Sequence, residues 1–315
     1  MKARSKKEGE HVFERLLVPL DTGEVAEQVL PYVRLLAKGL GQPVTLVSVV
    51  ADAGELNPVA SAHDAAIAAL IDKRREYAQR YLDAIRARLE AEGVAVSTEV
   101  RVGSVADSIV AAASALHAGL VVMATHGRVG PERWFLGSVA DRVVRTAASP
   151  VLLVRPRADG VAPAVSVREI LLPLDGSPAA EAALPAATVL AQAFHVPVTL
   201  IRTLPMPWFI VGADPYGGVD VLPPEVLGQL EDEAKRYLEQ VAAQLRTSGV
   251  ATKVAFASFR QPAQEITDLA EATSGALVVM TTHGRSGLSR TVLGSVTDRV
   301  IRSSAAPVLM AREAS

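Results

Sequence analysis

Short apolar runs alternate along the chain with longer segments in which apolar residues recur every three or four positions. In the first half, the periodic segments predict helices at 24–40, 65–92, 104–117 and 138–147, and the second half repeats the pattern. Strands that alternate with helices of this length predict right-handed crossovers and a parallel sheet covered by helices on both faces. The runs expected to form strands lie at 16–20, 44–50, 94–102, 119–124, 150–155, 169–174, 198–204, 250–257, 276–281 and 307–311.

The second half of the chain repeats the first in its residues as well as in its pattern. Pro19-Leu20-Asp21 matches Pro173-Leu174-Asp175, and residues 137–155 match residues 294–312 without a gap. We therefore expect an α/β protein of two tandem doubly wound domains, each with a five-stranded parallel sheet. The expected division is a basic disordered tail at 1–13, a first domain at 14–156, a linker at 157–167 and a second domain at 168–315.

Composition and charge exclude several classes of function. Half of the residues are hydrophobic and only 4% are aromatic, which suits parallel sheets packed with Ala, Val, Leu and Ile. The absence of cysteine excludes disulfides, thiolate metal sites and thiol nucleophiles. A formal net charge of −2 argues against capture of nucleic acid or of an anionic membrane. No apolar run reaches the about 18 residues of a membrane span, and no signal peptide is evident, so we expect a cytoplasmic protein.

One passage with the pattern of a phosphate-binding loop occurs in both halves, after the fourth apolar run of each. Residues 123–138 and 280–295 each contain His-Gly-Arg, a loop, and a Gly-Ser pair that opens an amphipathic segment. Such a loop presents backbone N–H groups to a phosphate at the N-terminus of a helix. Ligands of open α/β sheets bind beyond the carboxyl ends of the strands, where the strand order reverses. Asp21 and Asp175 end the first strand of each half, so we expect them to face the same crevice as the loop.

These residues carry a resemblance to a known family. Both halves resemble universal stress protein domains, over roughly 14–155 and 168–312. The family's nucleotide loop has nine residues between its second glycine and the Gly-Ser pair, and this spacing is intact from Gly127 to Gly137 and from Gly284 to Gly294. The resemblance implies an adenine nucleotide alpha hydrolase-like fold that binds ATP, with AMP and ADP as alternatives and Mg²⁺ as an accompanying ion.

The resemblance also implies which residues contact the nucleotide in each domain. The loop would wrap the phosphates and the ribose, and the base would lie near the first two strands. The residues implied in the first domain are Pro19, Asp21, Val49, Met123, Ala124, His126, Gly127, Arg128, Gly137, Ser138 and Val139. The residues implied in the second domain are Pro173, Asp175, Thr203, Met280, Thr281, His283, Gly284, Arg285, Gly294, Ser295 and Val296.

Both copies depart from the family pattern at its first glycine, where they carry Ala124 and Thr281. A methyl group at Ala124 is a small intrusion, whereas Thr281 adds a branched side chain where the backbone approaches the ligand. We therefore expect the first site to bind nucleotide better than the second.

Several of these residues also have a structural interpretation. The serines Ser138 and Ser295 have an aspartate three residues later, which is the pattern of a capping box with serine as the N-cap. Asp21 and Asp175 also suit the cap of the next helix, and Ser177-Pro178 supplies an N-cap serine followed by proline. Arg128, Arg285, Arg133 and Arg290 either assist phosphate binding or are solvated, and His126 and His283 are expected to orient the loop. No catalytic or metal-binding residue is expected, because no triad or ligand spacing surrounds these histidines.

The sequence therefore predicts a stress-response protein that binds ATP and signals, without dedicated catalysis. Two alternatives remain: an interaction protein that has lost the nucleotide, and a weak ATPase or phosphotransferase, which would need a metal and a positioned water. The family resemblance implies that the two domains form a pseudo-dimer through their last strands, Val151–Val154 and Val308–Met310, and the whole chain could form a homodimer. The Pro- and Gly-rich segment 205–224, with three aromatic residues, could be a lid or a contact surface.

Overall fold

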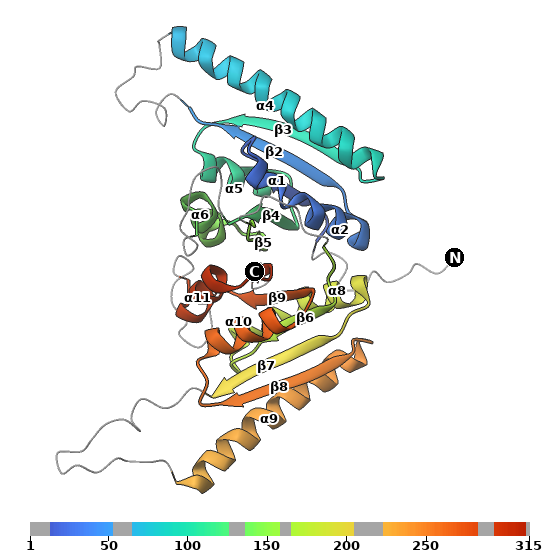
Figure 1. The fold of residues 1–315 in the computed structure, drawn as a ribbon, viewed down its shortest axis with the longest axis vertical. Coiled ribbons are helices and arrows are strands. Elements are labelled where there is room, and N and C mark those ends of the chain that lie inside the picture. The colour runs from blue at the N-terminus through green and yellow to red at the C-terminus, as the bar shows by residue number, and fades with distance from the viewer. Residues whose placement is uncertain are drawn as a thin grey trace, which may run out of the picture. The chain divides into compact units, whose positions relative to one another are not determined.

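The fold is known from a computed structural model that describes residues 13–52, 65–125, 136–157, 165–204, 223–282 and 293–312. Contacts divide the chain into two compact units (Figure 1). One unit contains the first sequence repeat together with Pro307–Arg312, and the other contains the rest of the second repeat. The predicted basic tail at 1–13 lies, except for its last residue, outside the described residues, as do most of the expected linker and of segment 205–224.

The first repeat alternates strands and helices in the predicted order. Its inner strands, at 16–19, 120–124 and 151–154, are short and apolar; Leu17 and Val18, for example, are fully buried. A run of this kind suits a strand that is covered on both faces. The elements are β1 (Leu16–Pro19), α1 (Glu24–Glu27), α2 (Leu30–Leu40), β2 (Val44–Val50), α4 (Ala65–Ala91), β3 (Val96–Val102), α5 (Val105–Ala115), β4 (Leu120–Ala124), α6 (Ser138–Thr146) and β5 (Val151–Val154).

The second repeat has the same series of elements. Its core is again built from aliphatic strand residues, of which Ile170, Leu171 and Leu172 are among the largest that are fully buried. The elements are β6 (Glu169–Pro173), α7 (Pro178–Glu181), α8 (Leu184–Phe194), β7 (Val198–Leu204), α9 (Pro224–Thr247), β8 (Thr252–Ser258), α10 (Pro262–Ala272), β9 (Ala276–Thr281), α11 (Ser295–Ser303) and β10 (Val308–Ala311).

The strand order reverses in the middle of each repeat. In the first unit the order is β3-β2-β1-β4-β5, and in the second it is β9-β6-β7-β8, with every pair within these series parallel. Right-handed crossovers then place the helices before and after the reversal on opposite faces of the sheet. The helices α4 and α9 pack on the outer strands of their sheets, whereas α5 packs on α6 and α10 on α11 (Figure 1). The predicted doubly wound fold class is confirmed.

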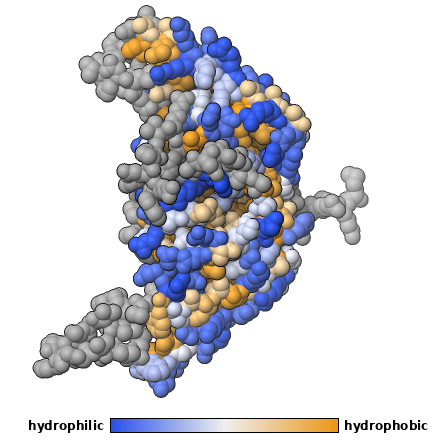
Figure 2. All heavy atoms as spheres, in the orientation of Figure 1, coloured by the Kyte–Doolittle hydropathy of each residue, from blue (hydrophilic) through white to orange (hydrophobic). Residues whose placement is uncertain are grey.

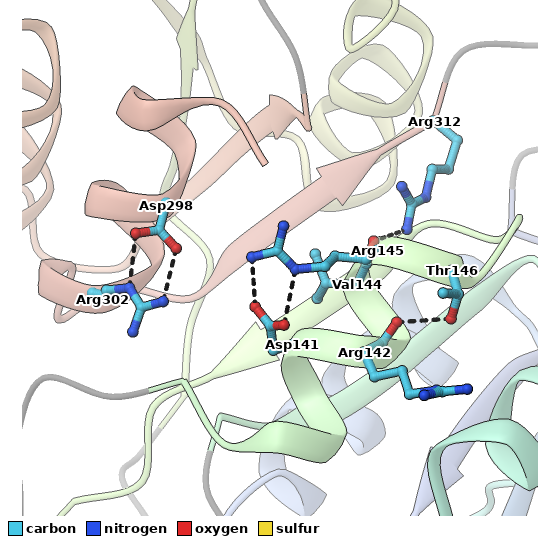
Figure 3. A network of polar contacts seen from close by, with 8 residues as sticks. All are labelled: Asp141, Arg142, Val144, Arg145, Thr146, Asp298, Arg302 and Arg312. Carbon is cyan, nitrogen blue, oxygen red and sulfur yellow. Dashed lines mark hydrogen bonds and ion pairs between the residues drawn. The ribbon is translucent and has the colours of Figure 1, made fainter. Parts of the chain in front are cut away.

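The last strands of the two repeats pair with each other in antiparallel fashion, as expected. Val308, Leu309 and Met310 of β10 lie opposite Leu153, Leu152 and Val151 of β5. This pairing is the reason why the contacts group Pro307–Arg312 with the first repeat. The Arg312 guanidinium adds a hydrogen bond to the Val144 carbonyl oxygen (Figure 3) and another to the carbonyl oxygen of Ser149.

The helix predicted at 24–40 is wrong in one respect, because it is two helices. The first, α1, ends at Glu27, and α2 begins at Leu30 with Pro31 as its second residue. A proline has no N–H and its ring clashes with the carbonyl group four residues earlier, which here belongs to Glu27. The second repeat breaks in the same way before Pro185, where α7 ends at Glu181.

Both long helices, α4 and α9, carry exposed apolar side chains. Leu70 and Tyr77 of α4 are 43% and 55% exposed, and Figure 2 shows apolar atoms at the end of the molecule where α4 begins. Among the described residues, no helix has both the length and the apolar character needed to cross a membrane.

Candidate functional site

Each repeat has a cavity at the carboxyl ends of its strands, where the strand order reverses. The cavities measure about 340 Å³ in the first repeat and about 310 Å³ in the second, within the range of small-molecule sites. Eight predicted residues line each cavity. They are Pro19, Asp21, Val49, Met123, Ala124, Gly137, Ser138 and Val139 in the first, and Pro173, Asp175, Thr203, Met280, Thr281, Gly294, Ser295 and Val296 in the second.

The remaining predicted site residues lie outside the described part of the chain. In the first repeat these are His126, Gly127, Arg128 and Arg133, and in the second they are His283, Gly284, Arg285 and Arg290. Their roles stay predictions.

The two aspartates hold the turn between the first strand and the first helix, but they are not N-caps as predicted. The N-caps are Gly23 and Ser177. Asp21 Oδ1 accepts a hydrogen bond from the Gly23 N–H at 3.0 Å. Asp175 Oδ1 accepts from the N–H and the hydroxyl of Ser177, at 2.9 and 2.6 Å. Each aspartate lies two residues before the cap, so its carboxylate orders the loop at the mouth of the cavity.

The predicted cap at Ser177-Pro178 is confirmed. The Ser177 hydroxyl accepts a hydrogen bond from the Ala180 N–H at 3.2 Å, and Pro178 is the first residue of α7.

The capping boxes predicted at Ser138 and Ser295 are wrong, because the preceding glycines are the N-caps. The Asp141 N–H donates to the Gly137 carbonyl at 2.8 Å, and Asp298 donates to Gly294 at 2.9 Å. The glycine N–H groups in turn donate to the carbonyl oxygens of Thr125 and Thr282. These bonds fix the glycines at the end of the loop, so each serine becomes the first residue of its helix.

The aspartates of the supposed capping boxes bind arginines instead. Asp141 forms a bidentate ion pair with Arg145, at 2.8 and 2.9 Å, and Asp298 forms the same pair with Arg302 (Figure 3). Ser138 and Ser295 are exposed and make no capping bond. Their hydroxyls therefore lie at the cavity wall without the structural task that the sequence suggested.

The threonine that replaces the family glycine in the second repeat leaves its cavity open. Thr281 is 7% exposed, and its carbonyl oxygen accepts a hydrogen bond from the Thr297 hydroxyl at 3.1 Å. The first repeat has Ala124 and Ala140 at these two positions. The two cavities differ in volume by only about 30 Å³ (340 minus 310), so the branched side chain does not fill the site.

The second cavity has a charged residue that the sequence analysis missed. Arg202 on β7 lines the cavity, and its guanidinium carbon lies 4.8 Å from the centre of the Tyr237 ring. Burial, together with a hydrogen bond from the Tyr237 hydroxyl to Glu181 at 2.8 Å, raises the pKa of Tyr237. Tyr237 is therefore a neutral donor and a platform for the guanidinium.

The other residues that sequence reasoning missed are mainly apolar wall residues. Alternation along β2 and β7 could have indicated two of them, because it places Val47 on the same face as Val49 and Ile201 on the same face as Thr203. Others belong to the first turns of α5 and α10. The missed lining residues are Leu20, Ala26, Val47, Val105, Ile109, Thr125 and Ala140 in the first cavity, and Leu174, Ala180, Ile201, Arg202, Leu204, Pro262, Ile266 and Thr297 in the second.

The described residues contain no group of three or more His, Asp or Glu side chains that could hold a metal ion. Among the charged residues described at the cavity walls, each cavity has one carboxylate, Asp21 or Asp175. The walls thus combine apolar side chains with a helix N-terminus, an arrangement that suits a ligand with an apolar part and an anionic part.

Comparison with known proteins places both repeats in one family. The model of the universal stress protein family matches residues 13–155 and 166–312. A universal stress protein of Mycolicibacterium smegmatis is 28% identical over 305 residues, covering 94% of this chain and 96% of the relative. One from Methanocaldococcus jannaschii is 32% identical over 148 residues, 47% of this chain and 85% of the relative. The crystal structure of a universal stress protein from Archaeoglobus fulgidus superposes with a TM-score of 0.68 at 19% identity, covering 96% and 98% of the two chains.

Proposed function

Because the chain belongs to the universal stress protein family, we propose that it is a cytoplasmic stress-response protein that binds adenine nucleotides. ATP is the proposed ligand, with ADP and AMP as alternatives. The proposed role is signalling through the bound nucleotide rather than its consumption.

The observation that carries this proposal is the match between the two cavities. Both lie at the reversal of strand order, which is where doubly wound folds bind nucleotides. Both are lined by the first residues of a nine-residue helix, Ser138–Thr146 or Ser295–Ser303. The first N–H groups of a helix have no partner within it and attract phosphate.

The apolar walls would hold the base. Val47, Val49 and Ile109 line the first cavity, and Ile201, Thr203 and Ile266 line the second. The carboxylates of Asp21 and Asp175 lie at the ends of the first strands and can accept hydrogen bonds from a base amino group or a ribose hydroxyl. Arg128 and Arg285 are proposed to meet the phosphates.

The described site supports binding more than catalysis. Phosphoryl transfer needs a metal ion held by carboxylates and a positioned water or hydroxyl, and each cavity wall offers a single described carboxylate. Mg²⁺ would be held by the nucleotide's phosphates with help from that carboxylate. Two alternatives remain to be tested. Nucleotide binding separates the proposal from an interaction protein without nucleotide, and an assay of phosphate release separates it from a weak ATPase.

Thermal unfolding with added ATP, AMP and GTP tests the proposal. A ligand that binds only the folded state stabilises it by about 2.7 kcal/mol at one hundred times its Kd, so ATP should raise the Tm in a concentration-dependent way. Val49→Trp combined with Thr203→Trp, which fills both cavities, is the control and should not respond. An unchanged Tm at millimolar ATP would contradict the proposal.

A further inference from the structure

The described walls of the two cavities differ in one charge. Asp21 is the only charged residue among those described at the wall of the first cavity, whereas the second is lined by Asp175 and Arg202. The arrangement of the strands aligns Arg202 with Ser48, because the Leu20 N–H donates to the Val47 carbonyl just as Leu174 donates to Ile201. Ser48 is 3% exposed and neutral. Among the residues described at the two walls, the difference in charge therefore arises at a single position.

The second repeat is built to hold this arginine. Its guanidinium stacks on Tyr237 at 4.8 Å. Gly176 also lies close to it, because a methyl group there would come within 3.1 to 3.3 Å of the guanidinium atoms. Gly176 has a φ of +85°, and the first repeat has Thr22 at the equivalent place, with a φ of +63°. The pair Gly176 and Arg202 in one repeat thus replaces Thr22 and Ser48 in the other.

This placement puts a fixed positive charge beside the turn that carries Asp175. The Asp175 carboxylate is held by Ser177, two residues on, and Gly176, which lies against the guanidinium, stands between these two residues in the chain. A negative ligand that enters the first cavity meets the charge of Asp21 without a described cation at the wall. In the second cavity Arg202 offsets the charge of Asp175.

We infer that Arg202 is a specificity-determining residue that makes the second site selective for highly charged nucleotides, so that it binds ATP in preference to AMP and adenosine more strongly than the first site does. The inference rests on the proposed function. A guanidinium that is already positioned loses little side-chain entropy on binding an anion. The loop arginines Arg128 and Arg285 occur at matching positions of the two repeats.

The test is a titration of ATP, AMP and adenosine by calorimetry, in a background that reports the second site alone. Val49→Trp fills the first cavity and supplies this background. Arg202→Ser installs the residue of the first repeat. Arg202→Lys keeps the charge, and Arg246→Ser removes an exposed arginine from α9 of the same repeat, outside the cavity.

We expect Arg202→Ser to weaken ATP binding about tenfold, equal to about 1.4 kcal/mol, and to change adenosine binding less than twofold. Arg202→Lys should recover most of the loss, and Arg246→Ser should bind as the parent does. Raising the salt concentration should weaken ATP binding more in the parent than in Arg202→Ser, because salt screens the charge.

Equal losses for ATP and adenosine would overturn the inference, since they would show a merely structural role. Unchanged ATP binding in Arg202→Ser would also overturn it while leaving the proposed function intact. If the chain without any substitution binds no ATP, as counted by native mass spectrometry, the proposed function itself fails.

Discussion

At the scale of single residues, the position of a helix start decides what a serine can do. Ser138 follows the capping glycine and is exposed, whereas Ser177 is itself a cap that accepts the Ala180 N–H. The sequence alone could not separate these cases, because both serines precede helices and have an acidic residue nearby. The hydrogen bond from the Gly137 N–H to Thr125, a contact across the loop, moves the helix start by one residue.

This difference predicts opposite behaviour for two alanine substitutions. Ser177→Ala should lower the free energy of unfolding by about 1 kcal/mol, as the loss of an N-cap does. Ser138→Ala should change it by less than about 0.5 kcal/mol, as at an ordinary surface site, and should weaken ATP binding. Urea denaturation of both variants checks the prediction. A larger loss for Ser138→Ala than for Ser177→Ala would restore the capping interpretation.

A second prediction for single residues concerns a glycine that lies close to the backbone of another segment. A methyl group at Gly119 would lie 2.4 Å from the Glu14 nitrogen and 2.6 Å from the Phe13 Cα, where the chain enters β1. Gly119→Ala should therefore lower the free energy of unfolding by about 1–3 kcal/mol. Gly228→Ala is the matched control, because that methyl group has nothing within 4 Å and the residue lies within α9. For Gly228→Ala we expect the free energy of unfolding, measured by chemical denaturation, to rise by up to about 1 kcal/mol.

At the scale of elements, the sequence predicted the strands and helices well because burial imposes their periods. Buried parallel strands read as apolar runs, and helices between them read as segments of period 3.6. The interruptions before Pro31 and Pro185 were missed, although the prolines mark them, because the apolar pattern continues across the break. The residues of the cavity walls were recovered only in part. The missed ones come from elements such as α5 and α10, which reach the site through tertiary packing.

Hydrogen bonds between polar side chains of three neighbouring strands make the stability of the second sheet sensitive to acid. Glu169 on β6 accepts a hydrogen bond from Thr199 on β7 at 2.5 Å and from Lys253 on β8 at 2.8 Å. Burial alone would raise the pKa of Glu169, but the bonds from Lys253 and Thr199 outweigh it and lower that pKa. In the first repeat, Arg15, Thr45 and Ser97 form the equivalent series of side-chain hydrogen bonds.

Because the pKa of Glu169 is lower in the folded state, its stabilising contribution is present above the unfolded value near 4.5 and is lost as the pH falls through the folded value. Glu169→Gln should thus lower the free energy of unfolding by about 1 kcal/mol at pH 7. The difference between the two proteins should be smaller at pH 3 than at pH 7. Urea titrations at the two pH values measure it, and an equal difference at both would refute the carboxylate's role.

At the scale of the whole molecule, the repeat in the sequence predicts two sites, and the structure shows two cavities with one charged position that differs. That difference lies inside a strand, where Arg202 is one charged residue among aliphatic residues and threonines. Its meaning depends on Tyr237 and Gly176, which are distant in sequence and are brought beside it by the fold. The pairing of the last strands was predictable from the family resemblance, and the resulting pseudo-dimer of the domains stays a prediction.

The strand pair that joins the two repeats should contribute strongly to stability. Leu309 is fully buried opposite Leu152. Leu309→Ala should lower the free energy of unfolding by about 2–5 kcal/mol, the usual range for a buried leucine. Leu230→Ala, at a residue 39% exposed on α9, is the control and should lose less than about 1 kcal/mol. If chemical denaturation shows the same loss of free energy of unfolding for Leu309→Ala and Leu230→Ala, the strand pair is not tightly packed.

The central claim is that this chain binds adenine nucleotide in two cavities of the same architecture. Its most direct test is native mass spectrometry of the full chain titrated with ATP, alongside Val49→Trp, Thr203→Trp and the double variant. The account predicts two ATP molecules bound to the unsubstituted chain, one to each single variant and none to the double variant. Absence of bound nucleotide at millimolar ATP, or undiminished binding in the double variant, would contradict it.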